Sequence, residues 1–290
     1  MEPKVSIIIP VYNTQELLPR CLESVTAQTL REIEIVCVDD GSTDSSLALL
    51  KDWAQRDERI VVISQANGRQ GKARNTGLNV ARGEYVGMVD SDDYVPADYF
   101  EKLYSAACRH NADIAVCGIL KEKLPANKNV ISFDTELVVS APADKLAQCK
   151  CPPDFYVYNK LYRRSMLEKL SLRFAENVQY EDVEFVMRAL CESGVLVTVP
   201  GVSYRYVLNP SSTVNSRQTP AKQAQKYAAH KAMVEYFAKN NLPLKEKYRN
   251  LTVRHFTLYG VCLWKIKEKG TRRVLRLFDV LPVCFWNTNK

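Results

Sequence analysis

The chain has 290 residues, of which 46% are hydrophobic and 25% are charged, and its formal net charge is +7. This length and composition allow a substantial buried core, and no apolar run reaches the ~18 residues of a membrane-spanning helix. The nine cysteines form an odd set without paired zinc-ligand spacing, which argues against a disulfide framework or a zinc module and favours reduced thiols in a cytosol.

Short apolar runs alternate with helical patterns in the first part of the chain. The apolar runs, which are rich in β-branched residues and end at turn residues, are 5–9, 33–38, 59–63 and 85–89. Such runs are typical of buried strands in a parallel sheet. The segments between them that carry helical patterns are 16–28, 44–56 and 71–81. This alternation predicts an α/β fold with a doubly wound, mostly parallel sheet flanked by helices.

An acidic segment, Asp90-Ser91-Asp92-Asp93, follows the last of these apolar runs. Carboxylates that a strand delivers into the loop at its carboxyl end lie where an open α/β sheet usually places its ligand. Their oxygens suit a hard cation such as Mg²⁺ or Mn²⁺, which bridges to the phosphates of a substrate. An Asp-x-Asp triplet also occurs in solvated turns, so the segment needs support from other motifs.

That support comes from four blocks that occur in one order. They are Val5-Ser6-Ile7-Ile8-Ile9-Pro10-Val11-Tyr12-Asn13, Val38-Asp39-Asp40-Gly41-Ser42-Thr43-Asp44, Ala73-Arg74-Asn75-Thr76-Gly77, and Gly83-Glu84-Tyr85 with the acidic segment. Together they closely resemble glycosyltransferase family 2, strongly over residues 4–120 and more loosely to about residue 214. The resemblance implies a GT-A fold, a nucleotide-sugar donor, a divalent metal (Mn²⁺ or Mg²⁺) and inversion at the anomeric carbon.

The resemblance also implies roles in a donor site. Asp92 would be the direct metal ligand, and Asp90 would reach the ribose or the metal, the latter through a bound water. Asp40 would accept a hydrogen bond from the uracil ring, and Arg74 would lie near the base and the diphosphate. The remaining residues expected to contact the nucleotide sugar are Pro10, Val11, Tyr12 and Ser91.

Some of these residues have simpler explanations. Tyr12 could pack in the core instead of stacking on the base. For Asp93 we expect a solvent-facing or helix-capping carboxylate. Arg69 and Lys72, on either side of the glycine before Arg74, are expected to be ordinary surface charges.

A second acidic pair, Glu181-Asp182, precedes a helical pattern. Attack by a sugar hydroxyl needs a carboxylate to accept its proton, and the resemblance points to Asp182 as this general base. Alternatively, the two acids cap the helix and favour its dipole. Glu181 and Arg205 are weaker candidates for contacts with the acceptor or the diphosphate, Arg205 because it lies in a block that resembles the family's closing strand.

The charge distribution indicates two parts. Residues 1–214 would form the catalytic domain, with a nucleotide-sugar-binding half over 1–120 and an acceptor-side half over 121–214. Residues 215–290 hold 16 Lys and Arg against 4 Asp and Glu, and we expect a mainly helical extension with helices over 221–240, 246–267 and 271–281. Its basic, aromatic-rich surface suits an anionic membrane, although a helical lid is an equal alternative. Nucleic acid is not expected as a partner.

The sequence therefore predicts an inverting, metal-dependent transferase of polysaccharide biosynthesis, making capsule or lipopolysaccharide. It would move a sugar from a UDP-sugar to a hydroxyl of a surface glycan or lipid-linked acceptor. The amino terminus lacks the pattern of a secretory signal, so we expect a cytoplasmic protein, peripheral on the inner face of the plasma membrane. The rival classes are a sugar-phosphate nucleotidyltransferase and a non-catalytic nucleotide-sugar-binding component of a membrane complex. Neither the sugar nor the oligomeric state follows from the sequence.

Overall fold

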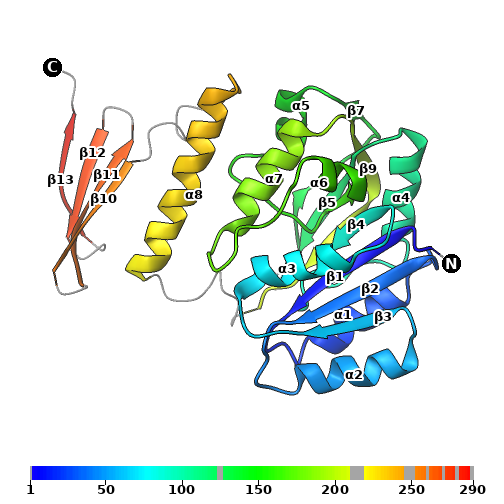
Figure 1. The fold of residues 1–290 in the computed structure, drawn as a ribbon. Helices are drawn as coiled ribbons and strands as arrows, with labels where there is room; N and C mark the ends of the chain where they lie inside the picture. The colour runs from blue at the N-terminus through cyan, green and yellow to red at the C-terminus, as the bar shows by residue number, and fades with distance from the viewer. Residues whose placement is uncertain are drawn as a thin grey trace. The chain divides into compact units, whose positions relative to one another are not determined.

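The computed structural model describes residues 2–122, 127–209 and 219–244, together with the backbone of four strands between residues 252 and 287. The chain divides into two units, Met1–Ser216 and Arg217–Lys290, which are described separately (Figure 1). The domain boundary predicted at residues 214/215 lies within 210–218, outside the described residues.

The first unit is built on a nine-stranded sheet with the order β3-β2-β1-β4-β8-β5-β9-β7, to which β6 adds by pairing with β5. The strands are β1 (Val5–Val11), β2 (Ile33–Asp39), β3 (Ile60–Ser64), β4 (Tyr85–Met88), β5 (Ile114–Lys121), β6 (Lys128–Ile131), β7 (Val138–Val139), β8 (Lys160–Arg163) and β9 (Leu196–Tyr206). Strands β1 to β4 are parallel, and the antiparallel β8 joins β4 to β5, which runs parallel to β9.

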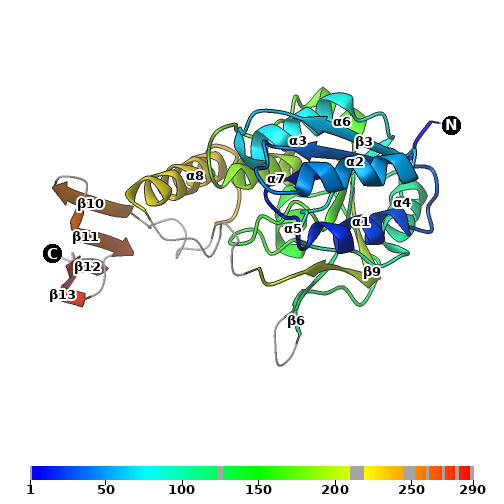
Figure 2. The ribbon, with the colours of Figure 1, turned by 90° about the horizontal axis from the view of Figure 1, so that it is seen from below.

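Helices cover both faces of this sheet (Figures 1 and 2). They are α1 (Leu18–Thr26), α2 (Ser46–Arg56), α3 (Arg69–Val80), α4 (Tyr99–Arg109), α5 (Pro142–Gln148), α6 (Arg164–Lys169) and α7 (Glu181–Glu192). The four predicted strands and the three predicted helices of the first part of the chain are confirmed, with small shifts at their ends.

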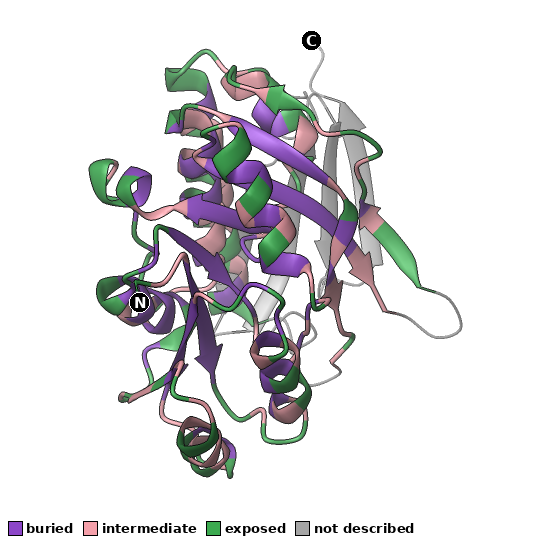
Figure 3. Ribbon diagram, turned by 90° about the vertical axis from the view of Figure 1, so that its right-hand side faces the viewer, coloured by how far each residue is buried: buried purple, intermediate pink, exposed green. Residues whose placement is uncertain are grey.

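Two close contacts show which helices lie on which face. A Cβ on Gly77 of α3 would lie 2.5 Å from the Ile8 side chain, and a Cβ on Gly87 of β4 would lie 2.4 Å from the Phe100 ring of α4. Gly87 pairs with Ile7, the neighbour of Ile8 in β1. Since neighbouring residues of a strand face opposite sides, α3 and α4 cover opposite faces. Figure 3 shows the buried strands between these two layers.

The second unit begins with α8 (Pro220–Lys239), which confirms the first helix predicted for the extension. The other two predicted helices are wrong. Instead, β10 (Thr252–Leu258), β11 (Val261–Lys269), β12 (Arg272–Leu277) and β13 (Leu281–Asn287) form an antiparallel sheet. The run Trp264-Lys265-Ile266-Lys267 alternates apolar and charged residues, and this period of two favours a strand over a helix. In the part of the chain that the structure describes, no helix combines the length and apolar character needed to cross a membrane.

Candidate active site

The predicted donor-site motifs meet at the carboxyl edge of the parallel strands. Val11 at the end of β1 pairs with Asp39 at the end of β2, and Ile8 of β1 pairs with Met88, the last residue of β4. A hydrogen bond of 3.1 Å from Thr14 Oγ1 to Ser91 Oγ ties the loop after β1 to the acidic loop after β4. The parallel register therefore gathers these sequence blocks into one site.

The residues expected around the nucleotide base differ in exposure. Pro10 and Val11 are buried within β1, whereas the Tyr12 side chain is 50% exposed, so Tyr12 does not pack in the core. Asp40 is buried, and its Oδ1 accepts hydrogen bonds from Gln65 Nε2 at 2.7 Å and from the Gly68 amide at 2.9 Å. Asp40, which follows β2, is thus held by hydrogen bonds from the protein, whereas Tyr12, which follows β1, is exposed.

Arg74 of α3 is the electrostatic centre of the site. Its side chain is 3% exposed and makes two ion pairs, from Nη2 to Asp90 Oδ1 and from Nη1 to Glu181 Oε1, each 2.9 Å long. Its guanidinium also lies over the Phe174 ring, 5.3 Å from the centroid. Burial opposes the charge of Arg74, but the nearby carboxylates outweigh it and raise the pKa of the guanidinium.

The position of Arg74 links parts of the chain that the sequence separates. Asp90 follows β4, and Glu181 is the first residue of α7, so one buried cation joins the acidic loop to the second acidic pair. Asp90 Oδ1 also accepts a hydrogen bond of 2.9 Å from Gln70 Nε2. Gln70 was not singled out in the sequence, where it has no distinguishing pattern.

The loop after β4 crowds its carboxylates together. Burial and the neighbouring Asp90 raise the pKa of Asp92, although a hydrogen bond of 3.1 Å from Asn209 Nδ2 to Asp92 Oδ2 opposes the shift. Burial, Asp90 and Asp92 raise the pKa of Asp93 to about 9. Burial and mutual repulsion therefore disfavour the charged forms of Asp92 and Asp93.

Asp93 corrects an expectation from the sequence. Its side chain is neither solvent-facing nor a helix cap, because the residue is 1% exposed and its Oδ1 accepts a hydrogen bond of 2.7 Å from the Val207 amide. The Asp90 amide in turn donates to the Tyr204 hydroxyl at 3.0 Å. The segment at the end of β9 thus holds the acidic loop through two hydrogen bonds. The sequence gives no signal for this because it depends on the end of β9 reaching the loop after β4.

Arg205 lies in the same segment but faces other neighbours. Its backbone pairs with Tyr94 in an isolated bridge, and its charge acts on the Tyr94 hydroxyl. Tyr94 also carries the Arg20 guanidinium over its ring, 4.4 Å from the centroid. The role expected for Arg205 towards the acceptor or diphosphate stays a prediction.

Asp182 differs from its neighbour Glu181. Glu181 is buried and paired with Arg74, whereas Asp182 is half-buried. Burial and the charge of Glu181 raise the pKa of Asp182 to about 7, against the opposing effect of Arg74. A carboxyl group with a pKa near neutrality is suited to accepting and releasing a proton at physiological pH.

The acidic loop offers carboxylate oxygens to a divalent cation. In the described residues no three His, Cys, Asp or Glu side chains gather into a ready-made metal site. Mg²⁺ and Mn²⁺ sites of this kind use one or two carboxylates and complete the shell with water and substrate phosphates. Asp90 and Asp92 supply such oxygens within a crowded, buried carboxylate group that Arg74 neutralises only in part. The residues present fit the expected metal.

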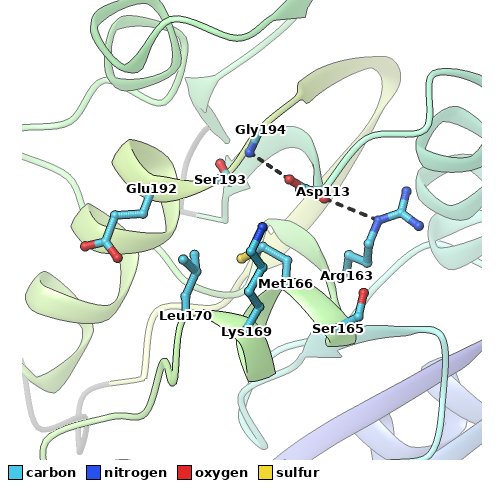
Figure 4. Close-up of a pocket in the computed structure, with 9 residues that line it drawn as sticks. All are labelled: Asp113, Arg163, Ser165, Met166, Lys169, Leu170, Glu192, Ser193 and Gly194. Atoms are coloured by element: carbon cyan, nitrogen blue, oxygen red, sulfur yellow. Dashed lines mark hydrogen bonds and ion pairs between the residues drawn. The ribbon is translucent and has the colours of Figure 1, made fainter.

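A pocket of about 430 Å³ lies elsewhere in the first unit (Figure 4). Its lining includes Asp113, Arg163 and Gly194, where the Asp113 carboxylate accepts from the Gly194 amide at 2.7 Å and pairs with Arg163 Nε at 3.3 Å. Arg163 pairs with Tyr85 at the start of β4, so this pocket is at the opposite end of the strands from the acidic loop. None of the predicted site residues lines it.

Comparison with known proteins identifies relatives of this chain. The model of Glycosyl transferase family 2 matches residues 6–171. The uncharacterized glycosyltransferase EpsJ of Bacillus subtilis is 35% identical over 243 residues, which cover 82% of this chain and 70% of the relative. The poly(ribitol-phosphate) beta-glucosyltransferase of Bacillus spizizenii is 32% identical over 71% of this chain and 32% of its own length.

Solved structures share the fold. Staphylococcus aureus TarS in complex with UDP-GlcNAc superposes with a TM-score of 0.71 at 23% identity, covering 85% of this chain and 69% of that one. The mannosyltransferase PcManGT of Pyrobaculum calidifontis, in complex with GDP-Man and Mn²⁺, gives 0.54 at 21% identity, covering 84% and 66%. These likenesses confirm the predicted GT-A arrangement of the α/β fold.

Proposed function

Because the chain belongs to glycosyltransferase family 2, we propose that it transfers a sugar from a UDP-sugar to a hydroxyl group of a surface glycan or lipid-linked acceptor, with inversion at the anomeric carbon. The observation that carries this proposal is that the adjacent acids Glu181 and Asp182 differ in their partners and surroundings. Arg74 binds Glu181, and the adjacent Asp182 is half-buried, with a carboxyl pKa raised to about 7 by burial and by the charge of Glu181.

The proposed transfer is a single displacement. The Asp182 carboxylate accepts the proton of the acceptor hydroxyl while the hydroxyl oxygen forms a bond to the anomeric carbon. The bond from that carbon to the diphosphate oxygen breaks, and UDP leaves with the bonding electrons. Attack from the face opposite the leaving group inverts the configuration. A positioned general base contributes about 10²–10⁴-fold to such a step.

The leaving diphosphate needs positive charge. A divalent cation would be held by Asp92, with Asp90 as a second candidate ligand, and it would supply electrostatic stabilisation to the departing phosphate oxygens. Arg74 holds the Asp90 carboxylate in place at 2.9 Å, and Asn209 orients Asp92 at 3.1 Å. These contacts set the positions of both carboxylates before the metal and the nucleotide arrive.

The donor is proposed from the surface at the ends of β1 and β2. The exposed Tyr12 ring offers a stacking face, and the buried Asp40 offers a carboxylate for the uracil ring. The structural relative TarS was solved with UDP-GlcNAc, which supports a uridine nucleotide. PcManGT was solved with GDP-Man, so the test is a panel of UDP- and GDP-sugars. Metal-dependent release of UDP, and not of GDP, is the expected result, and the reverse preference would refute the uridine assignment.

The cellular position is proposed from charge. Residues 215–290 hold 16 Lys and Arg against 4 Asp and Glu. Each cation near an anionic leaflet contributes about 1 kcal/mol to attraction. We therefore propose that the second unit holds the enzyme at the inner face of the plasma membrane, where a lipid-linked acceptor of capsule or lipopolysaccharide synthesis would be presented.

A further inference from the structure

Tyr180, the residue before the Glu181-Asp182 pair, has an unusual backbone conformation. Its φ of 66° and ψ of 31° place it in the left-handed region, where a non-glycine residue is uncommon and a bulky one is strained. It also occupies the N-cap of α7, a position that normally has extended backbone and a side chain that caps the helix. Tyr180 makes no such side-chain cap.

Most of the other left-handed residues have local explanations that Tyr180 lacks. Among the described non-glycine residues with positive φ, four are asparagines, the residue type that tolerates this region best. Lys150 and Ser171 follow the C-caps of α5 and α6, where left-handed residues commonly end a helix. Arg69 and Tyr180 remain, and each lies at the start of a helix, α3 and α7. Of the two, Tyr180 is the aromatic residue and the one next to the Glu181-Asp182 pair.

The Tyr180 side chain makes few described polar or aromatic contacts. The residue is half-buried, and within the described part of the chain its ring pairs with no other ring and its hydroxyl has no hydrogen-bond partner. Its one described electrostatic neighbour is Asp182, which together with burial raises the pKa of the Tyr180 hydroxyl. A strained backbone conformation at a residue beside a candidate catalytic group is typical of a functional contact.

We propose that Tyr180 forms part of the acceptor-binding surface, where its ring packs against the C–H face of a pyranose whose hydroxyl reaches Asp182. This inference rests on the proposed function, because it assigns the side of Asp182 to the acceptor. Aromatic rings carry a negative face that attracts polarised C–H groups, so a ring beside the base selects and orients a sugar. The left-handed backbone turns the ring to this position.

The test separates the ring from the backbone strain. Tyr180→Gly relieves the strain and removes the ring, Tyr180→Asn tolerates the left-handed region without a ring, and Tyr180→Phe keeps the ring. Ser171→Gly is the matched control, because Ser171 has a φ of 50° and is exposed outside the site. Binding of a panel of methyl and p-nitrophenyl pyranosides is measured by saturation-transfer NMR in the presence of UDP, and unfolding is measured thermally.

Both glycine variants should unfold about 1–4 °C above the wild type, because glycine adopts positive φ without strain. Tyr180→Gly and Tyr180→Asn should weaken pyranoside binding about tenfold or more, while Tyr180→Phe and Ser171→Gly stay within about twofold of the wild type.

Three results would overturn the inference. They are unchanged pyranoside binding in Tyr180→Gly, a lower unfolding temperature of that variant, and failure of the wild type to bind any pyranoside of the panel. Release of UDP from UDP-sugars by the same wild-type preparation tests the proposed function separately, so the two failures are distinguishable.

Discussion

Arg74 and Glu181 are 107 residues apart in the sequence and joined by a buried hydrogen bond of 2.9 Å. Through this bond α3, which carries the donor-side arginine, is fixed to the first residue of α7, which carries the proposed base at its second residue. Arg74 binds Asp90 with its other nitrogen. Arg74 therefore connects the acidic loop after β4 to the start of α7.

Arg74→Met should destabilise the first unit. It leaves the Asp90 and Glu181 carboxylates, 18% and 10% exposed, without their cation, and breaking a buried pair costs about 3–5 kcal/mol. Arg74→Lys should recover only part of this, since an ammonium does not reproduce a fork with two partners. Chemical denaturation measures both. Arg56→Met is the control, because Arg56 is 65% exposed and its pair with Asp52 contributes about 0–1 kcal/mol. Equal losses in Arg74→Met and Arg56→Met would contradict the connecting role.

Asp92→Asn should weaken metal binding and slow turnover. The amide keeps the shape of the side chain but removes the anionic ligand, so Mn²⁺ binding in the presence of UDP should weaken strongly and turnover should fall about 100-fold or more. Calorimetry of Mn²⁺ binding gives a readout independent of turnover. Asp98→Asn makes the same change at a partly exposed carboxylate paired with Lys102 and should leave Mn²⁺ binding unaltered. Normal Mn²⁺ affinity in Asp92→Asn would remove this residue from the metal site.

The pH dependence of transfer follows from Asp182. A general base works only when deprotonated, so the rate should rise with pH through a limb centred at about 7, the raised pKa of Asp182. Glu181→Gln removes a negative neighbour that raises this pKa, and the limb should move to lower pH. The measurement is kcat/KM against pH, which reports the pKa values of the free enzyme. A limb near the ordinary aspartate pKa of about 4, or one unmoved by Glu181→Gln, would argue against this assignment.

Membrane docking is tested with the second unit. Replacing Arg272, Arg273 and Arg276 by Glu should release the enzyme from anionic vesicles, and high salt should do the same because it screens charges beyond about 10 Å. Release of UDP from UDP-sugars should persist in the soluble variant, since the donor motifs lie in the first unit. Vesicle flotation provides the measurement. A wild-type protein with no preference for anionic over neutral vesicles at low salt would leave the second unit as a cover for the fold or a dimer surface.

The sequence predicted the parallel strands and the donor motifs because both depend on local patterns. A buried run such as residues 33–38 and the turn residues that end it can be recognised without knowing how the rest of the chain packs. The blocks around Asp40 and Asp92 follow such runs. The burial of Asp93 and the bond between Arg74 and Glu181 depend instead on how β9 and α7 pack against the first strands. The strands after α8 were missed because apolar residues at helical spacing obscured the alternation around Trp264.

We have proposed Asp182 as the base of a metal-assisted transfer from a UDP-sugar. The most direct test compares UDP affinity and UDP-sugar turnover of the wild type and Asp182→Asn in the presence of Mn²⁺. Because Asp182 is assigned to the acceptor, we expect the variant to bind UDP as the wild type does and to transfer the sugar to an acceptor hydroxyl about 10²–10⁴-fold more slowly. Turnover close to the wild-type rate in a folded Asp182→Asn variant would contradict the claim, as would loss of UDP affinity in parallel with loss of thermal stability.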